Sequence, residues 1–93
     1  MNGQPARATA IIVNKRGLHA RASAKFVETA ARFQSEVTVT KGDASVSGRS
    51  IMGLMMLAAS LGSSIELAAQ GPDASEAVAA LVALISAKFH EDA

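Results

Sequence analysis

Apolar and polar residues alternate strictly in two segments of the chain, as expected for β-strands that bury one face. These segments are residues 36–41 (EVTVTK) and residues 64–70 (SIELAAQ). A Gly-Asp pair at 42–43 is typical of a hairpin turn, so residues 44–48 are predicted to return as a strand beside the first. Residues 7–13 (RATAIIV) become β-branched towards their end and predict one further strand.

Three other segments place their apolar residues on one face of a helix. The last of them has the most regular amphipathic stripe in the chain. The first helix is expected over about residues 20–33. The second is expected over residues 50–57, with Ser50 as its N-cap and Gly62 as its C-terminal stop. The third is expected to begin at Asp73 or Ser75 and to end at about Phe89.

The element order is therefore β-α-β-β-α-β-α. Strands with one polar and one apolar face need cover on one side only, which predicts an α+β fold. We expect an open-faced two-layer sandwich, with a four-stranded sheet carrying three helices on one face. A chain of 93 residues suits one domain over residues 1–93, ordered from about 6 to 89 after a loose terminus.

Composition narrows the possible classes of protein. Hydrophobic residues make up 49% of the chain and charged residues 18%, which excludes a disordered protein. There is no cysteine, and the two histidines lie far apart without clustered acids, so we expect no metal and no cofactor. No apolar stretch approaches the length of a membrane span, and the net charge is only +1. We expect a cytoplasmic monomer without membrane insertion or nucleic-acid binding.

His19 is the strongest candidate for chemistry. It lies at the expected start of the first helix, where free backbone N–H groups and Arg21 form an anion site. Positive surroundings favour a neutral ring that can attack a phosphoryl group, and small residues from Ala20 to Ala24 leave the site open. If the ring takes up a phosphoryl group that it must release again, we expect it to be exposed and to make few strong contacts. The alternative is a histidine that only caps the helix, whereas His90 is expected to be a solvated surface residue.

The segment GRSIMGLMML is too apolar for a short helix to bury completely. Met52 and Met55 are therefore expected to be exposed and to form a docking surface, since methionine adapts to different partners. The alternative is that all the methionines fill gaps in the core. Ser50 is expected either to act only as a helix N-cap or to be a phosphorylation site as well.

The segments GLHARASAKFVETA and GRSIMGLMMLAASLG together resemble the HPr family, the histidine-containing phosphocarriers of bacterial phosphotransferase systems. The similarity extends over about residues 8–89, and the two motifs at this spacing are specific. It implies an antiparallel sheet with strand order 1-4-2-3. It also implies a carrier without turnover of its own, which accepts a phosphoryl group from enzyme I on Nδ1 of His19. The carrier would pass the group to an EIIA-type domain, in sugar uptake or in nitrogen-related regulation.

The resemblance assigns roles to further residues. Arg21 would stabilise the phosphoryl charge, and Ser50 would be the regulatory serine, open to an HPr kinase/phosphorylase. The implied docking face comprises Ala20, Ala24, Ile51, Met52, Leu54 and Met55. Most family members have proline, expected at the first helical position, where this chain has Ala22. We expect phosphotransfer to survive this difference, with altered kinetics or partner choice.

Other functions fit the sequence less well. The main alternative is a regulatory protein-binding module that acts through the Met-rich helix without phosphotransfer. A small RNA-binding domain would need aromatic residues on its strands and more than the small basic patch of Lys15, Arg16, Arg21 and Lys25. A hydrolase would need a carboxylate pair or a Ser-His-Asp arrangement near His19, and neither is recognisable.

Overall fold

Within residues 5–92, which the computed structural model describes, four strands form one antiparallel sheet in the order β1-β4-β2-β3. The strands are β1 (Ala6–Ile11), β2 (Glu36–Lys41), β3 (Ala44–Ser47) and β4 (Ser64–Gln70). Alternation sets which face is covered: Val37 and Val39 of β2 are buried, whereas Glu36 and Thr38 point to solvent. The predicted strand order is confirmed.

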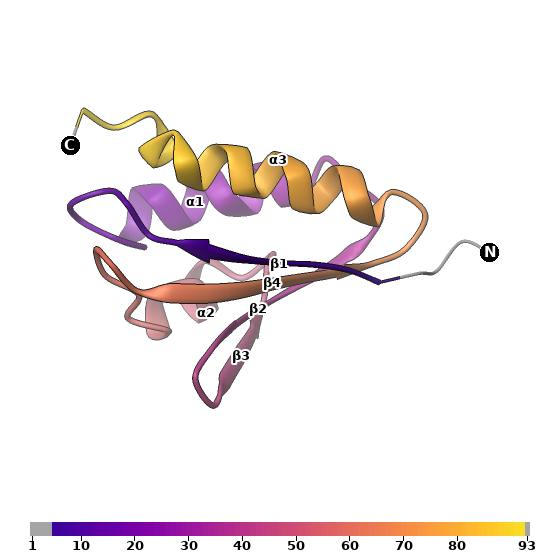
Figure 1. The fold of residues 1–93 in the computed structure, drawn as a ribbon, viewed down its shortest axis with the longest axis horizontal. Coiled ribbons are helices and arrows are strands. Elements are labelled where there is room, and N and C mark those ends of the chain that lie inside the picture. The colour runs from indigo at the N-terminus through magenta and orange to yellow at the C-terminus, as the bar shows by residue number, and fades with distance from the viewer. Residues whose placement is uncertain (1–4, 93) are drawn as a thin grey trace.

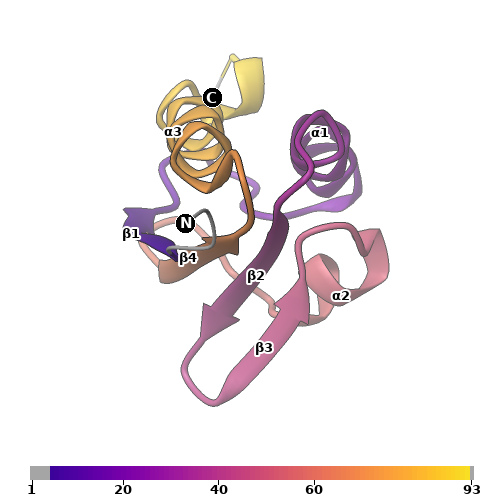
Figure 2. The same cartoon turned by 90° about the vertical axis from the view of Figure 1, so that its right-hand side faces the viewer.

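All three α-helices of the described chain lie on one face of this sheet, so the predicted sandwich is also confirmed (Figure 1 and Figure 2). Helices α1 (Ala20–Ala30) and α3 (Ala74–Ser86) run side by side above the strands. The shorter α2 (Ile51–Met56) lies below α1, next to β3 (Figure 2). Strand β1 therefore delivers the chain to the end of the sheet where α1 starts.

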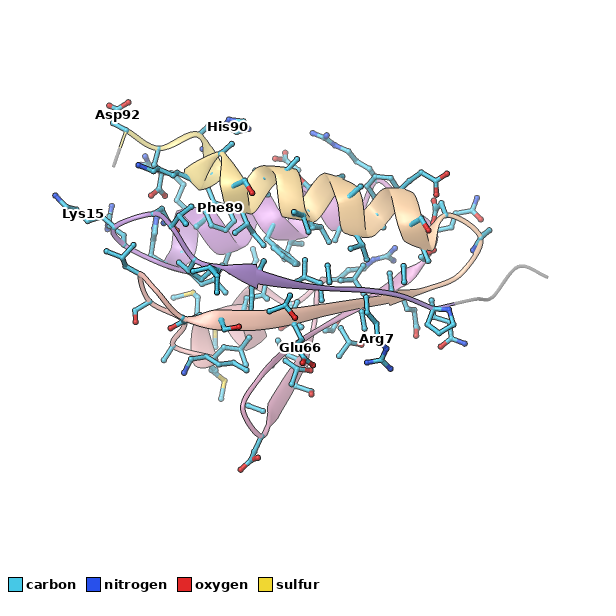
Figure 3. The ribbon with its side chains drawn as sticks, in the orientation of Figure 1. Arg7, Lys15, Glu66, Phe89, His90 and Asp92 are labelled. Atoms are coloured by element: carbon cyan, nitrogen blue, oxygen red, sulfur yellow. The ribbon has the colours of Figure 1, made fainter. Side chains whose placement is uncertain are left out.

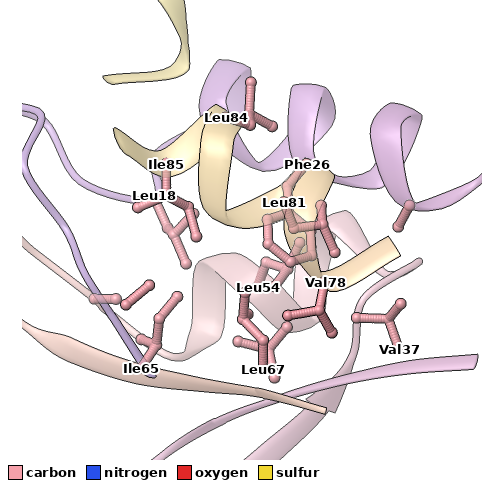
Figure 4. Close-up of a cluster of buried hydrophobic side chains, with 14 of the residues drawn as sticks. Leu18, Phe26, Val37, Leu54, Ile65, Leu67, Val78, Leu81, Leu84 and Ile85 are labelled. Atoms are coloured by element: carbon pink, nitrogen blue, oxygen red, sulfur yellow. The ribbon is translucent and has the colours of Figure 1, made fainter. Parts of the chain in front are cut away.

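The apolar stripes of α1 and α3 meet the buried face of the sheet. Figure 4 shows Phe26 of α1 and Leu81 of α3 above Leu67 of β4, and all three side chains are fully buried. Leu54 of α2 is also fully buried and lies in the same cluster, near Leu67. Each such side chain contributes about 1.5–3 kcal/mol when it leaves water completely.

The helices end earlier than the stripes predict. Helix α1 ends at Ala30 and not at Phe33, and α3 ends at Ser86 and not at Phe89. Residues Lys88–His90 form a separate 3-10 turn, η1, in which all three have positive φ, from 55 to 62°. Such angles cost about 1–3 kcal/mol each for residues with a side chain. Burial of Phe89 and the hydrogen bond from Lys25 Nζ to its carbonyl oxygen (2.7 Å) hold the turn.

Two smaller expectations about α2 and β1 are wrong. Gly62 does not end α2, because the helix ends at Met56 and Ala58 takes the left-handed angle (φ 52°). Gly62 instead forms the turn before β4 (φ 91°). Strand β1 runs from Ala6 to Ile11, one residue earlier and two residues shorter at its end than expected. Most of the expected loose terminus, residues 1–4, lies outside the described residues.

Asp73 is the N-cap of α3, but its carboxylate does not cap the helix. It accepts hydrogen bonds from the Ser35 hydroxyl (2.6 Å) and from the backbone N–H groups of Gln34 and Ser35 (both 2.9 Å). The Ser35 hydroxyl bond is the main reason why the pKa of Asp73 lies below its usual value. Asp73 thus joins the α1–β2 loop to the start of α3.

Candidate functional site

The loop before α1 is held in one conformation by its contacts with the loop before β4. Gly17 has a φ of 65°, and a Cβ atom there would lie 2.3 Å from the carbonyl oxygen of Ala59, so only glycine fits. The next residue, Leu18, is buried and donates its N–H to the same oxygen at 2.9 Å. This packing determines where α1 begins and therefore where His19 stands.

His19 is the N-cap residue of α1, as predicted, with extended backbone angles (φ −73°, ψ −179°). Its carbonyl oxygen accepts the first helical hydrogen bond, from Ser23 N–H at 2.8 Å. The His19 imidazole makes no hydrogen bond to the backbone N–H groups of α1. The alternative interpretation, that His19 only caps the helix with its side chain, is therefore not supported. The backbone N–H groups of the first helical turn are left without partners inside the helix.

The imidazole is not the exposed ring with few contacts that we expected. Its side chain is only 16% exposed, and Nε2–H donates a hydrogen bond to the Glu91 carboxylate, which is itself only 14% exposed. The other oxygen of Glu91 accepts a hydrogen bond from Asn14 Nδ2 at 3.0 Å. Asn14 is fully buried and also donates to the carbonyl oxygen of Gly17, at 2.9 Å.

Glu91 is the ionised partner in this arrangement. Burial raises the pKa of Glu91, but hydrogen bonds from His19 and Asn14, together with the electrostatic effect of the nearby His19 and Arg16 side chains, lower it below the usual value. A carboxylate can only accept hydrogen bonds, so the proton of a neutral His19 ring belongs on Nε2. The lone pair is then on Nδ1, the other ring nitrogen.

His19 and Arg21 share an open pocket of about 360 Å³ at the start of α1. Lys15, His90 and Asp92 lie at the same end of the molecule (Figure 3). The residues that line the pocket are Lys15, Arg16, His19, Arg21, Lys25, His90, Glu91 and Asp92. Four side chains with permanent positive charge thus oppose two carboxylates, which favours an anion in the pocket.

A slightly larger hollow, about 380 Å³, lies over β2 and β3 and is lined by residues such as Thr38 and Arg49. Its lining contains no histidine and none of the residues proposed from the sequence to take part in phosphotransfer, regulation or docking. Size alone therefore does not locate the site, and the chemistry of the lining residues favours the pocket at His19.

The small residues of α1 divide between surface and core. Ala20 and Ala24 are exposed, whereas Ala22 and Ser23 are fully buried and do not open the site. Ala22 is the third residue of α1 and not the first, so it precedes the first helical hydrogen-bond donor, Ser23. The alanine that replaces the usual proline therefore leaves the helical hydrogen bonds unchanged.

The Met-rich surface formed by Ile51, Met52, Met55 and Met56 is exposed on α2. Met52 is 71% exposed and Met55 41% exposed, which confirms that these methionines do not simply fill the core. Leu54 was expected in the docking face, but it is fully buried and belongs to the core. Met56, at 79%, was missed although it is more exposed than either predicted methionine.

Ser50 caps α2 as the sequence predicts. Its Oγ accepts a hydrogen bond from the backbone N–H of Gly53 at 2.9 Å, from an extended backbone (φ −113°, ψ 108°). Gly53 lies close to its neighbours, since an added Cβ would approach Ser50 Oγ at 3.0 Å and Val46 Cβ at 3.1 Å and would require a small shift of these side chains.

Glu91 and Asn14 were not predicted as parts of the site, and Lys25 was named only as a member of the small basic patch. Glu91 follows the last helix in the sequence FHED, and Asn14 lies in the polar turn NKRG, where asparagine is common for local reasons. Neither position carries a signal of its partner 72 or 77 residues away.

Comparison with known proteins assigns the chain to a family. The family model described as the PTS HPr component phosphorylation site matches residues 6–87. The chain belongs to the HPr family. It is 60% identical to the phosphocarrier protein HPr of Neisseria meningitidis over 80 residues, 86% of this chain and 90% of that protein. It is 44% identical to the phosphocarrier protein NPr of Shewanella violacea over 86% of this chain and 88% of that protein.

Solved structures agree with this assignment to the HPr family. The crystal structure of HPr-C-His from Thermoanaerobacter tengcongensis matches with a TM-score of 0.90 and 46% identity, over 95% of this chain and 99% of that one. This HPr-type chain is therefore a phosphocarrier of the phosphotransferase system. No helix among its described residues has the length and apolarity required to span a bilayer.

Proposed function

We propose that Nδ1 of His19 accepts a phosphoryl group from enzyme I and that an EIIA-type domain then receives it. One observation carries this assignment: the Glu91 carboxylate occupies Nε2 of His19, while the ring stands at the N-terminus of α1 in a basic pocket. The nitrogen left with a lone pair is the one that can act as nucleophile.

The surroundings suit the product of this transfer. The Nδ1 lone pair forms the bond to phosphorus, while the bond between phosphorus and the donor breaks and its electrons leave with the donor. The phosphoryl oxygens then carry close to two negative charges. Free N–H groups of the first turn of α1 and the guanidinium of Arg21 supply hydrogen bonds to these oxygens.

Docking is assigned to the exposed residues around the site. Ala20 and Ala24 of α1 and the Met-rich surface of α2 offer small and adaptable apolar contacts to enzyme I and to the acceptor. Ser50 lies at the edge of the Met-rich surface, where phosphorylation by an HPr kinase/phosphorylase would add charge. The proposal places the carrier in the cytoplasm, as a monomer without a metal or cofactor.

The test is phosphorylation by phosphoenolpyruvate and enzyme I. The wild-type protein is expected to gain one acid-labile phosphoryl group, and His19→Ala none, while both proteins have the same circular dichroism spectrum. His90→Ala is the matched control, because it removes the other histidine of the same pocket, and it is expected to accept phosphate normally. An acid-labile phosphate on folded His19→Ala protein would contradict the proposal.

The exposure of Met52 and Met56 also fits a regulatory module that only binds partners. In that case the wild-type protein would bind its partners through the Met-rich surface but gain no phosphate in the same assay. The phosphorylation experiment therefore separates the two functions.

A further inference from the structure

The segment after α3 turns back to the start of α1 and is anchored on both sides of the site. Phe89 is fully buried, and its carbonyl oxygen accepts a hydrogen bond from Lys25 Nζ of α1 at 2.7 Å. Lys88, Phe89 and His90 all have left-handed backbone angles, which residues with side chains adopt only where tertiary contacts hold them. The chain leaves this turn with the Glu91 carboxylate hydrogen-bonded to the His19 ring.

Both oxygens of the Glu91 carboxylate have assigned partners. One accepts Nε2–H of His19, and the other accepts Nδ2–H of Asn14, which is itself buried and bonded to the carbonyl oxygen of Gly17. The carboxylate is therefore fixed in orientation by the loop that also places His19. Hydrogen bonding at both oxygens is consistent with the lowered pKa of Glu91.

The charges that face the ring come from three parts of the chain. Lys15 and Arg16 belong to the loop before α1, and Arg21 and Lys25 belong to α1. His90, Glu91 and Asp92 belong to the segment after α3. Of these groups, Glu91 alone makes a direct hydrogen bond to His19 within residues 5–92. It is the group that offsets the surrounding cations at the ring.

We propose that Glu91 is a positioning residue that keeps the Nε2 proton on His19 through both phosphoryl transfer steps. This inference rests on the proposed phosphorylation of His19. When Nδ1 forms its bond to phosphorus, the ring retains Nε2–H and becomes a positively charged N-phosphoryl imidazolium paired with the carboxylate. When the acceptor attacks phosphorus, the N–P bond breaks and its electrons return to Nδ1, leaving a neutral ring. No proton moves in either direction.

Two consequences follow for the site. The phosphoryl group cannot form on Nε2 while Glu91 holds that nitrogen. The bond at Nδ1 also stays easy to break, because a protonated ring leaves as neutral imidazole, whereas an unprotonated ring would have to leave as an anion. A carboxylate that served only to hold the C-terminal segment in place would affect neither property.

The first experiment uses potassium phosphoramidate, a small donor that can reach either ring nitrogen and needs no enzyme I. Phosphorus NMR of the wild-type protein is expected to show the Nδ1 isomer, whereas Glu91→Ala is expected to give about tenfold or more of the Nε2 isomer relative to wild type. Asp92→Ala, which removes an exposed carboxylate of the same pocket, is the control and is expected to match wild type. Identical isomer ratios in all three proteins would overturn the proposal.

The second experiment uses Glu91→Gln, which keeps the shape of the side chain but removes its charge. Nitrogen-15 NMR of the unphosphorylated wild-type protein is expected to show the Nε2–H tautomer. The pH at which hydrolysis of phosphorylated His19 is half-maximal is expected to fall by about one unit in Glu91→Gln. Thermal melting curves check that the variants are folded, and the wild-type tautomer tests the proposal even if they are not. An Nδ1–H tautomer in wild type, or an unchanged hydrolysis profile in folded Glu91→Gln, would contradict the positioning role.

The two experiments on Glu91 can be distinguished from a failure of the proposed phosphorylation by enzyme I. If enzyme I does not phosphorylate the wild-type protein, but the isomer ratio changes in Glu91→Ala and the wild-type ring is the Nε2–H tautomer, the function is wrong and the positioning role stands. If enzyme I phosphorylates His19, but neither the isomer ratio nor the hydrolysis profile depends on Glu91, the function stands and the positioning role is wrong.

Discussion

At the scale of single residues, the site balances positive and negative groups around one imidazole. The cations of the pocket favour an arriving phosphoryl group, and a ring surrounded only by cations would resist any positive charge of its own. Glu91 provides the opposite charge at Nε2, on the side of the ring away from the nucleophilic nitrogen. In the proposed mechanism, the pocket therefore attracts the phosphoryl group and the ring can still release it.

Arg21 is expected to contribute through both its charge and its planar fork of donors. Arg21→Lys should lower the rate of phosphotransfer from enzyme I about 3- to 10-fold, since lysine keeps the charge but not the bidentate geometry. Arg21→Glu should lower it about 100-fold or more, because a carboxylate repels the phosphoryl group. Rapid-quench measurements with phosphorylated enzyme I check both values. Equal rates for wild type and the glutamate variant would remove Arg21 from the mechanism.

At the scale of elements, the polar residues discussed above lie at the N-termini of the helices. The N-terminus of α1 carries His19, the proposed phosphoryl site, that of α2 carries Ser50, and that of α3 carries Asp73. Only Ser50 uses its side chain to cap its own helix. Asp73 instead bonds to the α1–β2 loop, so acidification should loosen the contact between that loop and α3.

The lowered pKa of Asp73 predicts a pH dependence of stability. A carboxyl group whose pKa is depressed in the folded protein stabilises it above the usual pKa, here 3.8. This contribution is lost as the pH falls from 3.8 through the folded-state value. Asp73→Asn should therefore melt at a lower temperature than wild type at pH 7, and the difference should shrink below pH 3.8. Melting curves across this range check the prediction, and a difference that does not depend on pH would contradict it.

Ser50→Asp is expected to impair partner binding without unfolding α2. Asp is a good N-cap, and negative charge is favourable at a helix N-terminus, so the melting temperature should change by only a few degrees. Partners that cover Met52 would have to desolvate the new charge, so phosphorylation of His19 by enzyme I should slow about tenfold. Ser50→Asn, which caps without charge, is the matched control. Unfolding of Ser50→Asp would show that Ser50 is mainly structural, and unchanged transfer would remove its regulatory role.

At the scale of the whole molecule, the six residues of α2 contribute to both the hydrophobic core and the exposed apolar surface. Leu54 points into the core, whereas Met52 and Met56 point into solvent from the same helix. An exposed apolar surface on a helix that packs against α1 is consistent with a carrier that must meet a donor and an acceptor in turn. That residues 1–93 form a single domain stays a prediction.

Substitutions on the two sides of α2 are expected to have opposite effects. Leu54→Ala should lower the free energy of unfolding by about 2–4 kcal/mol, because it leaves a cavity among buried side chains. Met52→Ala should change it by less than about 0.5 kcal/mol but raise the apparent KM for phosphotransfer from enzyme I. Denaturant unfolding measures the free energy of unfolding of both variants, and transfer kinetics with enzyme I measure the apparent KM. A stable Leu54→Ala protein, or normal transfer by Met52→Ala, would show that the two sides of α2 have been misassigned.

The sequence by itself determined the features that depend on residues close together in the chain, namely the strands, the helices and the helix cap at Ser50. Alternation predicts β2 and β4, helical spacing predicts α1 and α3, and a serine before an apolar run predicts the cap at Ser50; all of these are confirmed. His19 and Arg21 lie two residues apart, so their common location follows from local geometry. The strand order came from the resemblance to the HPr family and not from the pattern.

Only the tertiary structure decided the contacts between distant segments. The bond between His19 and Glu91 depends on the left-handed turn at Phe89, and the bond between Ser35 and Asp73 depends on where two loops meet. Leu54 and Met52 have similar side chains, and only the position of α2 against the sheet makes one core and the other surface. Local patterns specify elements, whereas the partners of a polar side chain depend on how those elements pack, which no short stretch of sequence contains.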